Sequence, residues 1–515
     1  MSTEFRGTRM SGQRQILLLT GRQWVWTITA LVVVSAATYR MCRGVSAWSS
    51  FAAGAMTAVI MHMAYSGGAI TPLPHIAVLI CALQYAIAPW AAQYCFHPQD
   101  SHYVIREPHR YFAYAGPAML SILLGWTLSC VGLHLTAKGS PPQRVSPQLH
   151  RALDLMFWGG IGLKAVLGSG ALGGLGFLFL LLANLRFIGV MGLMVLRVPG
   201  WRWRAAVVLI LEISGAAGSG MFHEFVLWSL GLFAVYVFTR RPSFPLLLVW
   251  LALMAAGVFL LNDAKWQLRE AVWAGSNQVT IFGKEYEMTP WNRPLVGGLC
   301  LLQSATRVFT GGYSEASVGD MVMRFNQGWI IDRVLENVPD SQPFAHGATV
   351  ISAFEASLLP RVFAPNKATA GGRMLMERYA DYAPFEDTSM DLGFAGEMYA
   401  NFGHWGGIAG CGVYALILGL LFRWVAVRAQ TSPLWWAIAA YVGHWALKAE
   451  TDIGTVLNYL VKAALVVFAV VLLLPDLRAE LTGRVEPTGQ PPRRDLQPRV
   501  KPGGGQLMRR PPTTG

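Results

Sequence analysis

Apolar runs of about 20 residues recur along this chain of 515 residues and constrain its fold more than any other feature. A helix needs about 20 apolar residues to cross a bilayer, whose hydrocarbon core is about 30 Å thick. We place about twelve such runs, with an error of about two. They lie at 23–39, 45–65, 70–90, 111–134, 153–169, 173–196, 204–220, 222–238, 244–262, 403–425, 433–449 and 455–475. The sequence therefore predicts an all-α polytopic membrane protein.

The composition supports this class and argues against nucleic acid binding. Only 13% of the residues are charged and 54% are hydrophobic, whereas about a quarter of the residues of soluble domains are charged. The net charge of +13 comes from basic residues that cluster at the ends of apolar runs and in the C-terminal tail. The positive-inside rule explains this placement. We therefore expect membrane lipids, and no nucleic acid, among the partners.

Motifs for metal, nucleotide and nucleophile chemistry are absent from the sequence. It contains no P-loop, no G-x-G-x-x-G after a strand, no H-E-x-x-H and no G-x-S-x-G. The six cysteines are scattered and include no C-x-x-C pair, which argues against a zinc or thioredoxin-like site. We expect neither a metal nor a cofactor.

Basic residues also predict the topology. The first apolar run follows four arginines without a cleavage site, so we interpret it as a retained signal-anchor span. Most remaining basic clusters fall on the same side as the N-terminus if both termini are cytoplasmic. This arrangement gives N-terminal transmembrane helices at 1–262, a large outer loop at 263–402 and C-terminal transmembrane helices at 403–475. The tail at 476–515 is rich in Pro, Gly and Arg and is predicted to be disordered.

The outer loop of about 140 residues is too long for an idle connection, so we expect function there. The run from Pro294 to Thr306 carries no charge but is too short to cross, and we interpret it as interfacial or re-entrant. The stretch from Ala348 to Leu359 fits an amphipathic helix that Pro360 ends.

Basic residues in the outer loop are the first candidate site. The positive-inside rule does not explain Arg324, Arg333, Arg361 and Lys367 on the outer side. Arginine has a planar fork that suits phosphate or carboxylate groups, so a lipid pyrophosphate at the outer leaflet is a fitting ligand. The alternative is that these cations pair with nearby carboxylates on a solvated surface.

Glu397 is the second candidate, within the run G-E-M-Y-A-N-F-G just before the span at 403. A carboxylate at the membrane face can serve as a base for a sugar hydroxyl, and the alternative is a structural glutamate that positions the helix start. Asn401 and Gly403 resemble cap and turn residues. His346 could hydrogen-bond a phosphate or sugar, or act only as a loop histidine.

Ionisable residues within the apolar runs form a third group. Arg186 and Glu212 lie in consecutive spans at similar depth, which predicts an ion pair between them. Other such residues fall near the predicted outer ends, where they could line a cavity shared with the outer loop. They are His223, Glu224, Lys448, Glu450 and Asp452.

The runs P-R-V-F-A-P-N-K (Pro360 to Lys367) and G-E-M-Y-A-N-F-G-H-W-G-G (Gly396 to Gly407) resemble those of bacterial oligosaccharide repeat-unit polymerases, the Wzy-type O-antigen polymerase family, which is related to the O-antigen ligases. The similarity covers about Arg324 to Gly407. It implies a GT-C-like membrane glycosyltransferase of the inner membrane. One departure is Gly218-Ser219-Gly220, which stands where the family often has Gly-Ser-Arg.

The resemblance implies roles for the candidate residues. The donor would be an undecaprenyl-pyrophosphate-linked oligosaccharide, so no metal or nucleotide is needed. Arg324, Arg333 and Arg361 would bind the pyrophosphate, and Glu397 would activate the acceptor hydroxyl. A chain-length regulator and a flippase of the same pathway are candidate partners. Two other functions stay open, a ligase that transfers finished glycan and a transporter or flippase for lipid-linked sugars.

Overall fold

Helices dominate the protein in the computed structural model. The structure describes residues 14–16, 21–66, 73–96, 103–136, 145–167, 176–219, 221–240, 242, 244–273, 278–289, 292–310, 312, 319, 322–358, 372–384 and 390–483. The helices of the first half are α1 (Gly21–Met41), α2 (Ala47–Ser66), α3 (Leu73–Ala82), the π-helix η1 (Leu83–Ile87), α4 (Ala88–Tyr94), α5 (Pro108–Ser129), α6 (Pro147–Leu167), α7 (Gly176–Val195), α8 (Trp201–Ser219), α9 (His223–Arg240) and α10 (Phe244–Trp273).

The second half is also helical. Its helices are α11 (Arg293–Phe309), α13 (Gly328–Asn337), α14 (Ala348–Leu358), α15 (Arg373–Tyr379), α16 (Gly393–Arg428), α17 (Leu434–Val442), the 3-10 helix η4 (Trp445–Leu447), α18 (Ile453–Leu473) and α19 (Pro475–Thr482). Two short antiparallel pairs complete the described part. They are β1 (Arg14–Ile16) with β2 (His134–Thr136), and β3 (Gln278–Ile281) with β4 (Lys284–Glu287).

Six helical segments of the described part are long and apolar enough to cross a membrane. They are Gln23–Met41, Leu73–Tyr94, Pro108–Ser129, Gly176–Val195, Gly393–Arg428 and Ile453–Leu473. The protein is therefore a predominantly helical membrane protein. Each predicted apolar run coincides with a helix, but α17 has 9 residues and is too short to cross by itself. The number of crossings stays a prediction.

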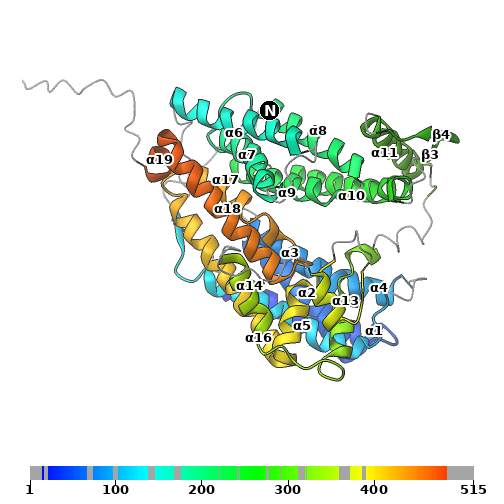
Figure 1. Ribbon diagram of the computed structural model, residues 1–515. Helices are drawn as coiled ribbons and strands as arrows, with labels where there is room; N and C mark the ends of the chain where they lie inside the picture. The colour runs from blue at the N-terminus through cyan, green and yellow to red at the C-terminus, as the bar shows by residue number, and fades with distance from the viewer. Residues whose placement is uncertain are drawn as a thin grey trace, which may run out of the picture.

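The helices form two groups that are joined through α17 and α18. Figure 1 shows α6 to α10 in one group, and α2, α5, α13 and α16 in the other, with α18 between them. Small residues allow close packing, because a side chain at Gly125 of α5 would collide with the backbone of Gly412 on α16. A separate small core joins α10, α11 and the β3–β4 hairpin around Leu268, Ile281 and Cys300.

The predicted elements of the outer loop have mixed outcomes. The amphipathic helix is confirmed as Ala348–Leu358. The charge-free run is part of the 17-residue helix Arg293–Phe309, which packs on α10 and α8. The last helix differs most, because α16 begins at Gly393 and not at 403. At Gly403 its backbone leaves the helical region (φ 70°, ψ −164°), so the predicted boundary marks a break inside the helix.

Candidate functional site

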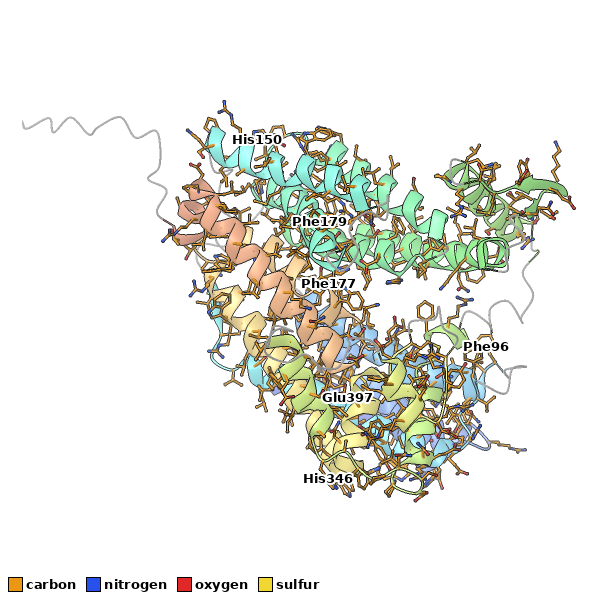
Figure 2. All side chains as sticks on the ribbon, viewed as in Figure 1. Phe96, His150, Phe177, Phe179, His346 and Glu397 are labelled. Atoms are coloured by element: carbon orange, nitrogen blue, oxygen red, sulfur yellow. The ribbon has the colours of Figure 1, made fainter. Side chains whose placement is uncertain are left out.

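Glu397 lies where three helices meet. It belongs to the first part of α16, and its side chain is 1% exposed. Its Oε1 accepts a hydrogen bond from the Thr349 hydroxyl of α14 at 2.7 Å. Its Oε2 accepts one from the backbone N–H of Ile453, the first residue of α18, at 2.8 Å. One carboxylate thus ties the first turns of two helices to a third. Figure 2 labels it inside the lower group of helices.

The sequence supplies this position with partners that suit a carboxylate. The first N–H groups of a helix lack intrahelical acceptors and carry partial positive charge. Glu397 satisfies one such donor in α18. Asp452 caps the same helix, because its side chain accepts bonds from the Thr455 N–H at 2.6 Å and the Thr455 hydroxyl at 3.0 Å. Glu397 thus holds the start of α18, as a structural glutamate would, although its partners are a hydroxyl and a backbone N–H and not an arginine. Its role as a base stays a prediction.

Asn401 completes the contact between α16 and α14. Its Nδ2 donates to the Thr349 hydroxyl at 2.7 Å and to the Glu397 carbonyl at 2.8 Å. Its Oδ1 accepts from the Gly347 N–H at 3.0 Å, just before α14 begins. Asn401 is therefore a cap, as its residue type suggests, but it caps a different helix from its own.

His346 lies at the edge of this network. Its backbone N–H donates to the Asn401 carbonyl at 3.1 Å, and its φ of 48° turns the chain into α14. The side chain is exposed, and Figure 2 labels it at the lower edge of the molecule. The structure therefore links His346 to Glu397 through Asn401 while it leaves the imidazole in contact with the surroundings.

Two further carboxylates, Asp391 and Asp452, lie close enough to Glu397 to act on it electrostatically. Burial raises the pKa of Asp391, and the nearby Asp452 carboxylate raises it further. The Asp391 Oδ1 accepts from the Gly372 N–H at 2.8 Å. Lys448 acts electrostatically on Asp391, and its Nζ lies 4.0 Å from the Oε1 of Glu450. The described surroundings of Glu397 are therefore rich in acidic groups.

Glu450 connects this acidic group to the π-helix η1. Its Oε2 accepts from the Gln84 side chain at 3.1 Å and from the Gln327 side chain at 3.4 Å. The adjacent Tyr85 hydroxyl donates to the carbonyl of Ala449. A π-helix widens one turn of a helix and occurs frequently at functional sites. Here it lets two successive residues of one span contact the segment between α17 and α18.

Arg333, a predicted anion-binding residue, lies on a face of α13 that is turned away from α16. Arg333 of α13 stacks near the rings of Trp329 at 5.7 Å and Tyr382 at 5.3 Å. The same helix turns Ile331 and Val334 toward Gly396 of α16. Residues 329 and 333 lie roughly opposite that face of a helix. The structure therefore does not direct Arg333 toward Glu397.

The described contacts do not join the other basic candidates to Glu397. Arg324 is partly buried and lies four residues before α13. Arg361 and Lys367 lie outside the described residues. The predicted assembly of arginines around a pyrophosphate stays a prediction.

A second polar cluster lies among α6, α7, α8 and α9. The predicted ion pair between Arg186 and Glu212 is confirmed, with Arg186 fully buried. Lys164 approaches Glu212 to 3.8 Å. Glu224 of α9 lies 3.2 Å from the His444 ring nitrogen, and that ring stacks on Trp228 at 3.8 Å.

Four site residues escaped sequence reasoning. They are Gln84, Thr349, Asp391 and His444. His444 precedes Lys448 by four residues, a helical spacing that could have drawn attention to it. The others carry no signal in their spacing, because their partners are distant along the chain.

Comparison of the chain with models of protein families, with curated proteins and with solved structures gave no match. The fold and the site define a helical membrane protein with a buried carboxylate at the meeting point of three helices.

Proposed function

We propose that the protein is a membrane glycosyltransferase that polymerises lipid-linked oligosaccharide repeat units for a surface polysaccharide or exopolysaccharide. The observation that carries the proposal is the contact between Glu397 and a hydroxyl group. The Thr349 hydroxyl donates to the Glu397 Oε1 at 2.7 Å, which is the interaction that a base makes with an acceptor sugar before proton transfer. The resemblance of the surrounding sequence to the O-antigen polymerases supplies the substrate class.

The proposal includes a topology. The protein would lie in the bacterial inner membrane with about twelve crossings, both termini cytoplasmic and a GT-C-like arrangement of helices. The buried Glu397 and the exposed His346 would then lie on the periplasmic side, where undecaprenyl-pyrophosphate-linked glycan is available.

The chemistry is a substitution at an anomeric carbon. The acceptor hydroxyl oxygen forms a bond to the anomeric carbon of the donor, while the bond from that carbon to the pyrophosphate oxygen breaks. The electron pair leaves with undecaprenyl pyrophosphate, and Glu397 takes the hydroxyl proton. The acceptor hydroxyl replaces the Thr349 hydroxyl at Oε1, while the Ile453 N–H continues to hold Oε2.

The donor pyrophosphate needs basic residues beyond the acidic surroundings of Glu397. We propose Arg324, Arg361 and Lys367 for this role, as the resemblance implies, with His346 at the exposed edge. Arg333 has the same proposed role only if the ligand extends to the face of α13 that carries Trp329. The pyrophosphate is the leaving group, so its charge must be neutralised as the bond breaks.

A reconstituted assay tests the site. Purified protein receives lipid-linked repeat units, and chain extension is followed on a gel. Glu397→Gln removes the base but keeps the side-chain shape, and Arg361→Ala removes a proposed pyrophosphate ligand. Glu397→Gln should reduce extension by more than about 100-fold, the scale of general acid–base catalysis. Arg361→Ala should reduce it by about 100-fold or more, the scale of losing one group that stabilises developing charge.

Matched controls use exposed residues of α15. Glu377→Gln and Arg378→Ala change the same residue types on a surface helix, and both should retain normal extension. Normal activity of both site variants would refute the assigned site.

Deletion of the gene separates the polymerase from other functions. Loss of long chains with retained single repeat units on the cell surface supports a polymerase. Long chains that remain on the carrier lipid indicate a ligase. Lipid-linked units trapped inside the cell indicate a flippase, a function that the buried ion pair of Arg186 and Glu212 would also suit.

A further inference from the structure

Helix α14 exposes an apolar face although it lies in the predicted polar loop. Ile351 is 59% exposed, Phe354 48% and Leu358 61%. These positions fall within about 60° of one another on a helical wheel. Exposure of three large apolar side chains on one stripe of a short helix to water is unfavourable, because their apolar surface stays hydrated. The stripe therefore requires an apolar partner.

The opposite face of α14 fixes its level relative to the candidate spans. Ala353 and Ser357 are each 6% exposed, and α14 packs on α18. A Cβ atom at Gly454 would lie 3.5 Å from the Cβ of Ala353. Gly454 is in the first turn of α18, which is a candidate span. Helix α14 thus lies at the end of α18 where that span begins.

The apolar stripe continues onto the exposed surface of α16. A Cβ atom at Gly347, next to α14, would lie 3.6 Å from the Phe402 ring. Phe402 is 46% exposed and Trp405 is 73% exposed. Ile417 and Leu421 are also exposed farther along the same candidate span. Large apolar side chains are thus exposed both on α14 and on the adjoining candidate span.

We propose that α14 lies in the membrane interface, with Ile351, Phe354 and Leu358 among the acyl chains of bilayer phospholipids. Aromatic residues such as Trp405 favour the same interfacial level. Glu355, the one titratable residue of α14, is exposed at the border of the stripe, where the headgroup region begins.

Membrane contact would set the position of the site. Thr349 is in the first turn of α14 and donates to Glu397. If α14 is held at the membrane interface, this hydrogen bond fixes the depth of the Glu397 carboxylate relative to the bilayer. This inference does not rest on the proposed glycosyltransferase activity, because it concerns only which surface contacts lipid.

Site-specific photocrosslinking tests the inference on the full-length protein. Ile351, Phe354 and Leu358 are replaced one at a time by p-benzoylphenylalanine, and each variant is reconstituted into nanodiscs of phosphatidylethanolamine and phosphatidylglycerol. Leu421 on the exposed face of α16 serves as the lipid-facing control, and the exposed Asp340 before α14 serves as the aqueous control. Adducts are identified by intact-mass spectrometry after illumination.

Phospholipid adducts at two or more of the three positions, at a yield within about threefold of Leu421 and at least tenfold above Asp340, support the proposal. Yields equal to that of Asp340 overturn it. Crosslinks between two protein chains also overturn it and would identify a second copy of the chain as the occupant. Three separate positions keep the test decisive if one variant fails to fold.

Discussion

Glu397 shows how one residue can combine a structural and a chemical role. Its two oxygens are held by donors from α14 and α18, so its loss should affect stability apart from any activity. The sequence singled out this carboxylate through its position in G-E-M-Y-A-N-F-G. It could not identify the two donors, because Thr349 and Ile453 lie 48 and 56 residues away along the chain.

Glu397→Ala should lower the free energy of unfolding by about 1–3 kcal/mol, because the Ile453 N–H loses its acceptor in a buried place. Glu397→Gln should stay close to the native stability, since its amide oxygen can still accept that bond. Thermal unfolding of the purified protein in detergent, followed by tryptophan fluorescence, measures both. Equal melting temperatures for Glu397→Ala and the exposed Glu377→Ala would contradict the structural role.

Asp391 should make the stability of the protein depend on pH. Its pKa is raised by burial and by Asp452, so the folded protein retains a proton that the unfolded chain releases near its ordinary pKa of about 4. Its contribution is therefore most favourable at low pH and is lost as pH rises from about 4 toward the raised pKa.

Asp391→Asn should flatten this decline, because the amide is neutral at every pH and can still accept from the Gly372 N–H. Melting temperatures between pH 5 and 8 test this expectation. Asp340→Asn at an exposed position should keep the native profile. An unchanged slope in Asp391→Asn would mean that another group determines the pH dependence.

At the scale of elements, the sequence predicted helices better than their ends. Helix α14 follows from its amphipathic pattern, and the apolar runs follow from hydropathy. The start of α16 was missed by ten residues, because Gly393–Phe402 contains polar residues that become buried only against α13, α14 and α18. Gly403 suggested a turn, and in the structure it breaks the helix without ending it.

Close packing between α5 and α16 gives a prediction at this scale. Gly125→Ala should destabilise the protein by about 1–3 kcal/mol, because the added methyl group would collide with the Gly412 backbone. Gly159 of α6 offers a matched control, since a Cβ atom there would meet open space. Gly159→Ala should be neutral or slightly stabilising, by at most about 1 kcal/mol. Equal effects in thermal unfolding would show that helix propensity, and not contact, dominates.

At the scale of the whole molecule, the connection from α17 to α18 joins the two groups of helices. His444 contacts Glu224 in one group, and Glu450 contacts Gln84 in the other. These polar contacts come from a segment of about ten residues, most of which belongs to the apolar run predicted at 433–449. The chain after the short α17 is irregular, and protein groups satisfy part of its backbone, as the Tyr85 hydroxyl does for the Ala449 carbonyl.

Reporter fusions test the predicted topology of the molecule. Alkaline phosphatase fused after Asp340 should be active, because that position is predicted to be periplasmic. Green fluorescent protein fused after Arg240 or Gly483 should fluoresce, since both positions are predicted to be cytoplasmic. Fluorescence of a fusion after Asp340 would reverse the orientation and would place Glu397 on the cytoplasmic side.

The sequence by itself determined the membrane class, most of the helices and the ion pair between Arg186 and Glu212. The first two depend on local composition, and the ion pair depends on how far each charged residue lies from the end of its apolar run. Only the tertiary structure decided that Glu397 is enclosed by the starts of α14 and α18, and that Arg333 turns toward Trp329. The reason is physical: hydropathy fixes which segments enter the membrane, whereas the partners of a polar side chain depend on how distant helices pack.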